Sequence, residues 1–111
     1  PTAWILICND TTIKEQPMIH DIGAAAENII IYAMGEGVGT CWLEGIDRAA
    51  IAQAIDLPAH LKITSAIALG YPAMHAREVE LPESGATPYY WGEDGALCVP
   101  KRSMDDVMLV K

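Results

Sequence analysis

The sequence predicts a small layered domain of the α/β or α+β class. Two apolar runs of strand length, residues 3–8 and 64–70, enclose two segments with a helical pattern, residues 21–34 and about 47–55. The order strand, helix, helix, strand is typical of domains in which helices cover a sheet. Because 111 residues suffice for only one modest core, we expect a single domain over residues 1–111.

The overall composition excludes several classes of protein. A hydrophobic content of 51% rules out a disordered chain. Seven Lys and Arg against fifteen Asp and Glu give a formal net charge of −8, which repels the phosphates of nucleic acids. No apolar run approaches the roughly 18 residues of a membrane span. We therefore expect neither a nucleic-acid partner nor a membrane.

The cysteines and histidines give no metal or nucleophile pattern. Cys8, Cys41 and Cys98 are odd in number and lack a C-x-x-C pair, which argues against a disulfide framework and a structural zinc site and favours a cytoplasmic compartment. No positioned His or acid accompanies Cys41, so we expect a small buried residue there. The three histidines are scattered singly, and no metal site is predicted.

The first strand, residues 3–8, is a continuous apolar run, as expected of a strand buried on both faces, and Asn9-Asp10 is typical of a turn after it. The chain begins with Pro1 rather than Met and enters this strand at once. We therefore expect the sequence to be a processed or cut piece of a longer chain.

The first helix is predicted over residues 21–34, with Asp21 as its N-cap. Only Glu27 and Asn28 are strongly polar in its interior, and a helix that is apolar nearly all round must be buried on most sides. One small subunit can hardly cover such a helix. We expect part of it to pack on a second copy of the chain.

The glycines at 35, 37 and 39 suggest a phosphate-binding loop, but such a loop follows a strand and opens a helix. Here the glycines follow a helix, so we interpret the first glycines as its C-terminal stop. Residues 40–43 then form a short extended piece, and Asp47 is a good N-cap for a second helix that ends before Leu57-Pro58.

The C-terminal third is predicted to be mainly loop. Residues 73–90 are polar, contain prolines and show no periodicity, which is typical of a long surface excursion. Tyr89-Tyr90-Trp91 is interpreted as an apolar anchor for this loop rather than a platform for base stacking.

A last short helix is predicted after Ser103, where S-x-x-D resembles a capping box, with Val107 and Leu109 on the helix. Lys101 and Arg102 come just before this helix start, where free N–H groups also favour anions, so the pair is a candidate phosphate site. The alternative is a solvated pair neutralised by the nearby Asp105 and Asp106. The residues alone favour the alternative, because most charged side chains are exposed.

Taken in order, these segments resemble the C-terminal part of the FMN-dependent nitroreductase family. The resemblance rests on Asp21-x-Gly23-Ala24 with its apolar helix, on Gly37-Val38-Gly39-Thr40-Cys41-Trp42, on Ile67-Ala68-Leu69-Gly70-Tyr71-Pro72, on Tyr90-Trp91 and on Val99-Pro100-Lys101-Arg102. Each segment alone is weak, but their order and spacing together are specific, including the subgroup with G-x-G-T-C-W and V-P-K-R. The match covers nearly the whole chain.

The resemblance implies an α+β fold, with a helix-flanked sheet, that forms an intertwined homodimer holding one FMN in each of two interface pockets. The main-chain amides of Glu44 and Gly45 would face N5 and O4 of the flavin, where a glycine permits close approach. Trp42 and Leu43 would pack on the ring, although Leu43 could equally be an ordinary core residue. Lys101 and Arg102 would hold the FMN phosphate. The resemblance therefore favours the phosphate site over the solvated pair that the residues alone favour. No side chain is assigned a catalytic role.

The function implied is oxidoreduction: NAD(P)H reduces bound FMN and leaves, and a nitroaromatic, quinone or similar small-molecule acceptor then takes the electrons. Family members also carry an N-terminal portion of similar size, with an R-S-x-R-like segment that contributes to FMN binding, and nothing in this chain matches it. The domain is therefore expected to be incomplete. The alternative function is a truncated, non-catalytic dimerisation module without a complete flavin site.

Overall fold

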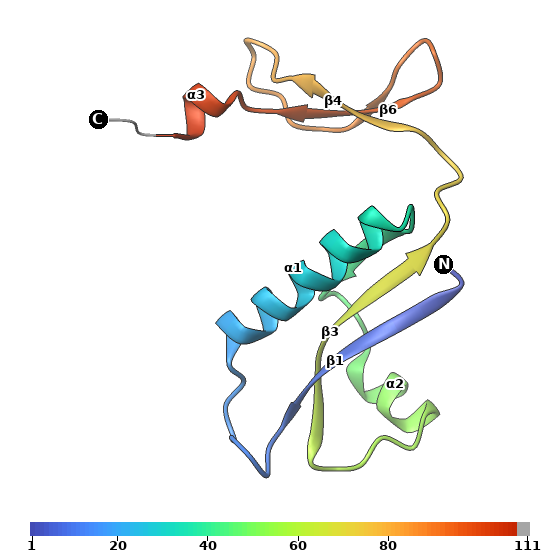
Figure 1. Cartoon of the computed structure of the whole chain (residues 1–111), viewed down its shortest axis with the longest axis vertical. Helices are drawn as coiled ribbons and strands as arrows, with labels where there is room; N and C mark the ends of the chain where they lie inside the picture. Colours follow the sequence, from blue (N-terminus) through green and yellow to red (C-terminus); the bar gives the residue numbers. More distant parts are fainter. Residues whose placement is uncertain (109–111) are drawn as a thin grey trace. The chain divides into compact units, whose positions relative to one another are not determined.

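The computed structural model describes residues 1–108 and divides the chain into two compact units, residues 1–71 and the part that follows Tyr71 (Figure 1). Unit 1 contains the predicted strands and the first two of the three predicted helices. Unit 2 contains a second small sheet and a short helix. Leu109, which we placed on the last helix, lies outside the described residues.

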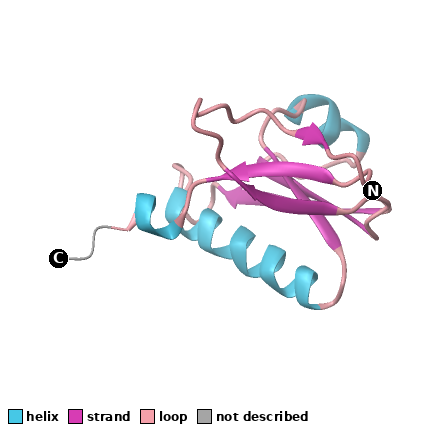
Figure 2. Cartoon of the chain, turned by 90° about the horizontal axis from the view of Figure 1, so that it is seen from above, coloured by secondary structure: helices cyan, strands magenta, loops and turns pink. Residues whose placement is uncertain are grey.

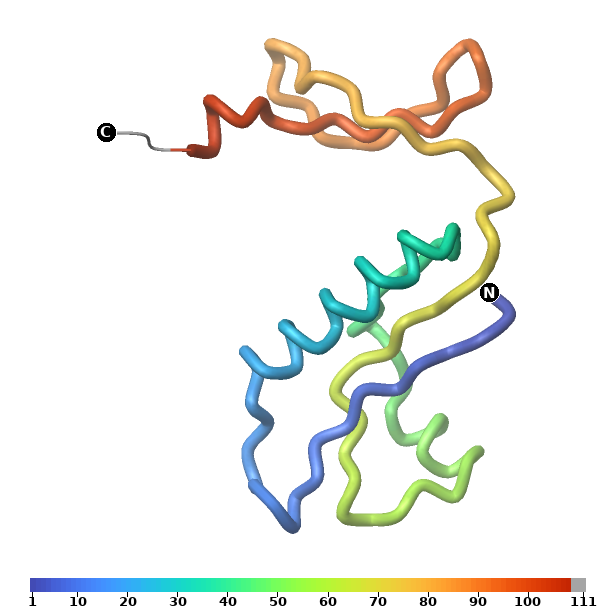
Figure 3. Tube along the Cα trace, in the orientation of Figure 1, coloured from blue at the N-terminus to red at the C-terminus, as the bar shows by residue number. Residues whose placement is uncertain are grey.

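Unit 1 is built on a three-stranded antiparallel sheet. Its strands are β1 (Ala3–Asp10), β2 (Gly39–Leu43) and β3 (Leu61–Gly70), in the order β1-β3-β2. The strands β1 and β3 are far apart in the sequence and run side by side (Figure 3). An antiparallel sheet with flanking helices is an α+β arrangement, so the structure confirms the second of the two predicted classes.

The core of unit 1 lies along β3, the central strand. Ile63, Ala66, Ile67 and Ala68 are buried. Successive side chains of a strand point to opposite faces, and the helices α1 (Ile19–Gly35) and α2 (Arg48–Ala54) lie on opposite sides of the sheet (Figure 2). The predicted strand over 64–70 is therefore confirmed and begins three residues earlier.

The strand β1 differs from its prediction. It extends through Asn9 and Asp10, which we had assigned to a turn. It is an edge strand, and Trp4 is 54% exposed, so the expectation of a strand buried on both faces is wrong for this unit. The apolar run was correctly read as a strand, but apolar composition alone does not specify how much of each face is covered.

The helix α1 begins at Ile19 after Met18, which makes no side-chain cap, so Asp21 lies in the first turn and is not the N-cap. Its end follows the prediction. The amide of Gly37 donates to Met34 O at 3.1 Å and that of Val38 donates to Ala33 O at 2.9 Å. This is a Schellman motif, and Gly37 supplies the left-handed residue with φ of 72°.

The outer side of α1 remains apolar and exposed. Only Ala26 and Ala33 of this helix are buried, whereas Ile19, Ile31, Tyr32 and Met34 are exposed. The sheet thus covers one narrow stripe of the helix. No helix among residues 1–108 combines the length and apolar character needed to cross a membrane.

The helix α2 has the N-cap that the sequence predicted. The Asp47 carboxylate accepts the amide of Ala50 at 3.0 Å. The helix ends at Ala54 with Ile55 as its C-cap, and Asp56 then adopts a left-handed φ of 51°. The stop therefore comes before Leu57-Pro58, because Asp56 takes the place that glycine usually occupies.

Unit 2 contains a second three-stranded sheet in the order β4-β6-β5, with strands β4 (Ala76–Glu80), β5 (Tyr90–Trp91) and β6 (Leu97–Lys101). The prediction of a structureless segment over 73–90 is therefore wrong for β4. Among the five residues of β4 only Val79 is a large apolar residue, and the strand forms by parallel pairing with β6. That pairing is non-local and leaves no periodic pattern in the sequence.

A polar cluster ties β4 to the loop before β6. Arg77 Nη1 lies 3.1 Å from Asp94 Oδ2, and Arg77 Nε donates to Cys98 Sγ at 3.5 Å. These contacts, the one to Cys98 first, raise the pKa of the Arg77 guanidinium. The aromatic side chains of Tyr89, Tyr90 and Trp91 are exposed, so the structure does not support their predicted anchoring role.

The helix α3 (Met104–Val107) confirms the predicted capping box. The Ser103 hydroxyl accepts the amide of Asp106 at 3.2 Å, and the Asp106 carboxylate accepts the amide of Ser103 at 3.3 Å. The sequence pattern specified this turn because both partners lie within four residues of each other.

The carboxyl of Asp10, at the end of β1, makes the stability of the fold depend on pH. Asp10 Oδ1 accepts both the amide and the hydroxyl of Thr12, at 2.8 and 2.6 Å, and these bonds, the hydroxyl first, hold the pKa of the Asp10 carboxyl below its usual value. A carboxyl whose pKa is lowered on folding contributes stability above its unfolded-state pKa and loses it as the pH falls through the folded-state pKa.

We therefore expect Asp10→Asn to flatten the acid limb of the stability curve, because the asparagine oxygen accepts the same bonds without titrating. Between about pH 6 and about pH 3, wild type should lose more free energy of unfolding than the variant in urea titrations. Equal losses in the two proteins would show that the Thr12 bonds do not favour the charged carboxylate.

Candidate functional site

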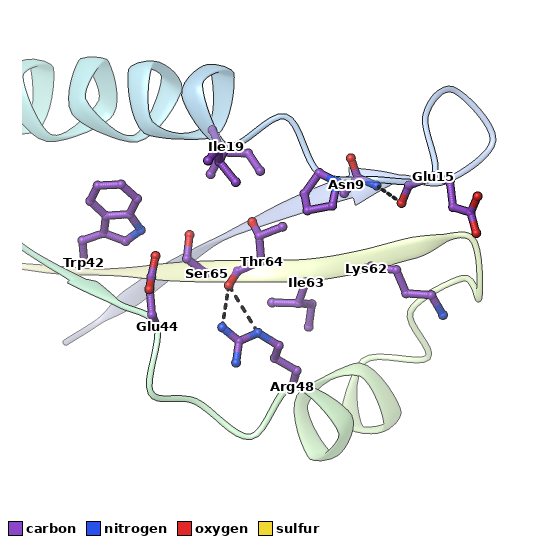
Figure 4. Close-up of a pocket in the computed structure, with 12 residues that line it drawn as sticks. Asn9, Glu15, Ile19, Trp42, Glu44, Arg48, Lys62, Ile63, Thr64 and Ser65 are labelled. Atoms are coloured by element: carbon purple, nitrogen blue, oxygen red, sulfur yellow. Dashed lines mark hydrogen bonds between the residues drawn. The ribbon is translucent and has the colours of Figure 1, made fainter.

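A pocket of about 440 Å³ lies in unit 1, at the edge of β3 that β2 leaves open. The strand β2 pairs with Ala66–Gly70 and ends at Leu43, so the first half of β3 has no β2 partner. The pocket fills part of this gap (Figure 4). Its walls are Asn9, Glu15, Pro17, Ile19, Ile22, Trp42, Glu44, Arg48, Lys62, Ile63, Thr64 and Ser65.

A β-bulge shapes the floor of the pocket. Ile7 of β1 pairs with Ser65 and the next residue, Cys8, pairs with Ile63, so Thr64 has no partner on β1. The Thr64 hydroxyl donates to Ile7 O at 2.8 Å. Bulges bend a strand and redirect its side chains. This bulge therefore sets the positions of the residues on either side of Thr64.

Arg48 holds the bulge from the open edge. Its Nε and Nη2 donate to the Thr64 carbonyl at 3.2 and 2.7 Å (Figure 4). Arg48 is the first residue of α2, which the Asp47 cap fixes. The guanidinium thus takes the place of a strand partner, and two charge-assisted hydrogen bonds join α2 to the pocket floor.

Ser65 is the unusual residue of the site. It is 1% exposed, and among the described residues its Oγ has no hydrogen-bond partner. Buried side-chain polar atoms nearly always have a partner, and an unpaired one costs about 1–3 kcal/mol. In Figure 4 the hydroxyl lies on the side of β3 that faces Ile19 and the Trp42 ring.

The pocket lining is mainly apolar and has no net charge. Pro17, Ile19, Ile22, Ile63 and Trp42 supply apolar surface. The ionisable side chains are Glu15, Glu44, Arg48 and Lys62, so two formal negative charges balance two positive ones. A concave apolar site with a few polar groups is the usual form of a small-molecule site.

The turn after β2 leaves two main-chain donors free. The Ile46 amide donates to Glu44 O at 2.9 Å, which closes a tight turn around Gly45. Within residues 1–108 neither the Glu44 nor the Gly45 amide donates to a hydrogen bond. A Cβ built on Gly45 meets nothing within 4 Å. The turn therefore has two free main-chain amides next to open space.

The predicted site residues are divided between the two units, four in unit 1 and two in unit 2. Trp42 and Glu44 line the pocket, whereas Leu43, which is half-buried, and Gly45 are not among its walls. Lys101 and Arg102 belong to unit 2, where both side chains are exposed.

Both side chains are exposed, as the alternative interpretation of a solvated pair expects, whereas its neutralising contacts are not found among the described residues. Neither cation forms an ion pair there. The Asp106 carboxylate, which was expected to neutralise the pair, accepts the Ser103 hydroxyl at 2.8 Å instead. The pair therefore keeps its charge available to an external anion.

Sequence reasoning missed Ser65, Arg48 and Thr64. A serine in the middle of an apolar strand is a signal of a buried polar group, but the bulge that places it depends on the pairing with β1. Cys41, expected to be buried, is exposed. No cluster of three potential metal ligands from His, Cys, Asp and Glu occurs in the part of the chain that the structure describes.

The fold of unit 1 is a sheet between two helices, and the neutral, largely apolar pocket at its edge has the usual form of a small-molecule site. A model of the nitroreductase family matches residues 6–71, which is more than half of the chain. The chain therefore belongs to the nitroreductase family, and the resemblance found in the sequence is confirmed.

The chain is also similar to a provisionally named NADH dehydrogenase/NAD(P)H nitroreductase of Archaeoglobus fulgidus, with 31% identity over 78 residues. The match covers 64% of this chain and 45% of the relative. The matched region thus spans less than half of the relative's length.

Proposed function

We propose that the chain is an FMN-dependent NAD(P)H oxidoreductase of the nitroreductase type, or the C-terminal half of one. Family membership supports a nitroreductase-type oxidoreductase. The observation that carries the assignment of a flavin is the pair of free amides at Glu44 and Gly45, next to open space and at the rim of an apolar pocket. These features fit a flat ring with hydrogen-bond acceptors at its edge.

When bound, FMN supplies the redox chemistry, which passes electrons from NAD(P)H to a small-molecule acceptor such as a nitroaromatic or a quinone. The chain's own contribution is binding and electrostatics. The Glu44 and Gly45 amides donate to acceptor atoms of the flavin and favour the more negative, reduced form. Trp42 contributes apolar surface to the ring, and the half-buried Leu43 is either a second apolar contact of the ring or an ordinary core residue.

Lys101 and Arg102 are proposed to hold the FMN phosphate. Arginine can bind a phosphate through two parallel N–H donors, and lysine adds a compact point charge. Their exposure and their lack of an ion pair within residues 1–108 support this role. The adjacent positions of the two residues leave both of them as candidates for the direct contact.

The proposed assembly is a homodimer in which α1 lies at the interface. Ile19, Ile31, Tyr32 and Met34 expose a large apolar surface on this helix, and such patches mark interaction sites in proteins that are otherwise well packed. A cytoplasmic location stays a prediction that rests on the three unpaired thiols.

Addition of FMN to the purified full chain tests the proposal directly. A ligand that binds only the folded state must raise the unfolding temperature, by an amount that grows with its concentration. We expect such a shift, together with quenching of FMN fluorescence. A dimer that is indifferent to FMN would favour the alternative, a dimerisation module without a complete flavin site.

Gly45→Val tests the position of the ring. The branched side chain enters the space beside the two free amides, so we expect FMN affinity to fall by about 1–3 kcal/mol, the usual cost of overpacking. Because a Cβ at this position meets no protein atom within 4 Å, the free energy of unfolding without FMN should change by less than about 0.5 kcal/mol. Fluorescence titration and urea unfolding measure the two quantities.

Gly45→Ala provides a graded control, with a smaller loss of affinity than valine. If valine lowers FMN affinity and apo stability equally, Gly45 is a packing residue of the turn. If neither quantity changes, the flavin does not approach this turn.

A further inference from the structure

The ladder between β2 and β3 stops at a point where its register would allow it to continue. Leu43 pairs with Ala66, so two more residues in the same register would bring Gly45 opposite Thr64. Residues of an antiparallel pair alternate between hydrogen-bonded and non-hydrogen-bonded positions, and the Thr64 carbonyl accepts its bonds from the open edge, the side of β2. In a longer β2 the Gly45 amide would therefore donate to the Thr64 carbonyl.

Arg48 occupies that acceptor instead. Its Nε and Nη2 donate to the Thr64 carbonyl at 3.2 and 2.7 Å (Figure 4). Such charge-assisted bonds are roughly twice as strong as the neutral bond that a main-chain amide would form, so a continued ladder would have to displace the stronger partner. The chain turns away at this point, through the bond from the Ile46 amide to Glu44 O at 2.9 Å. In the described part of the chain the Gly45 amide is left without an acceptor.

The other surroundings of Arg48 do not account for an arginine at this position. Arg48 is the first residue of α2, and no acidic residue lies in the first turn of this helix. A cation at a helix N-terminus opposes the helix dipole and is unfavourable there. Among the described residues the guanidinium forms no ion pair with a carboxylate. Its bonds to the Thr64 carbonyl are therefore the contacts that explain its presence.

We propose that Arg48 is a positioning residue that keeps the Gly45 amide available to a ligand, because it takes the acceptor to which this amide would otherwise bond. Loss of the guanidinium would free the Thr64 carbonyl, extend β2 to Gly45 and draw the turn onto β3. The consequence for a cofactor rests on the proposed function, which assigns the Gly45 amide to the flavin. Arg48 then raises the affinity for FMN through the conformation of the turn.

Amide exchange in the full chain without FMN tests the competition itself. In the ¹⁵N,¹³C-labelled wild type the Gly45 amide should exchange rapidly with water. Arg48→Met keeps an unbranched side chain but removes every donor. In this variant exchange at Gly45 should slow by about two- to tenfold, as one neutral hydrogen bond predicts, and a scalar coupling across the bond from Gly45 N to Thr64 C′ should appear.

Two further variants make the result specific. Arg48→Lys keeps the charge but lacks the planar fork of two donors, so exchange at Gly45 should lie between wild type and Arg48→Met, and it provides the same readout where the methionine variant does not fold. Gln53→Met places the same side chain at an exposed position of α2 and should leave exchange at Gly45 unchanged. A purely structural arginine would give the opposite sign, because its loss would loosen the turn and speed exchange.

Titration with FMN separates this inference from the proposed function. Arg48→Met should bind FMN about two- to tenfold more weakly than wild type, since the flavin must then displace the Thr64 carbonyl from the Gly45 amide. Slower exchange at Gly45 in a chain that does not bind FMN, or whose FMN affinity is unchanged, would support the competition and reject the flavin at this turn. Unchanged or faster exchange at Gly45 in every Arg48 variant that folds would overturn the inference, whatever the FMN affinity.

Discussion

Replacing Lys101 and Arg102 together with alanine should weaken FMN binding by about 1.5–3 kcal/mol for each charged hydrogen bond lost, which is about 10- to 150-fold per bond. Both side chains are exposed and neither forms an ion pair within the described part of unit 2. Their removal therefore leaves the packing of this unit unchanged, and the loss should appear in ligand affinity alone.

Riboflavin, which lacks the phosphate, makes the test specific. Wild type should bind FMN more tightly than riboflavin, and the double variant should bind the two with similar affinity, measured by fluorescence titration. The single variants show which cation makes the direct contact. Lys14→Ala removes an exposed charge from unit 1 and should leave the preference for FMN intact. A double variant that keeps the full preference would remove the phosphate assignment.

The parts of the fold that the sequence predicted are those specified by local interactions. The Asp47 cap, the Ser103 capping box and the Gly37 stop each join residues within five positions of one another, so a short pattern contains both partners. The strand β4 and the edge position of β1 were missed. Both depend on pairing between distant segments, β4 with β6 and β1 with β3, and no local pattern encodes that choice.

In the candidate site, too, short sequence patterns identified some residues, whereas residues that depend on distant contacts were missed. Trp42 and Glu44 were found because a family pattern contains them, and both line the pocket. Ser65 was read only as part of a buried strand. Its importance arises from a missing hydrogen bond, and whether a buried hydroxyl has a partner is a property of the folded structure that sequence alone does not contain. Arg48 was missed for a similar reason, since its acceptor lies on another element.

Truncation of Ile67, in the strand β3, should have the second large effect, a loss of stability. Ile67 is 0% exposed at the centre of β3, where it pairs with Ile5 of β1 and Trp42 of β2. Replacing it with alanine should lower the free energy of unfolding by about 2–5 kcal/mol, because the transfer energy of the lost atoms is added to the cost of the cavity. That is a large share of the 5–15 kcal/mol typical of whole proteins.

Urea unfolding of the FMN-free chain measures this loss, with Ile13→Ala as the matched control. Ile13 lies in the turn after β1 and is 85% exposed, so its truncation should cost less than about 0.5 kcal/mol. Equal losses at the two positions would mean that β3 is not the core of unit 1. Because Trp42 pairs with Ile67 across the ladder and also lines the pocket, the Ile67 cavity should loosen the pocket wall and weaken FMN binding by any molecules that remain folded. Gly45→Val, by contrast, should weaken FMN binding with little loss of stability, so the pair of variants separates the core role of β3 from recognition of the flavin.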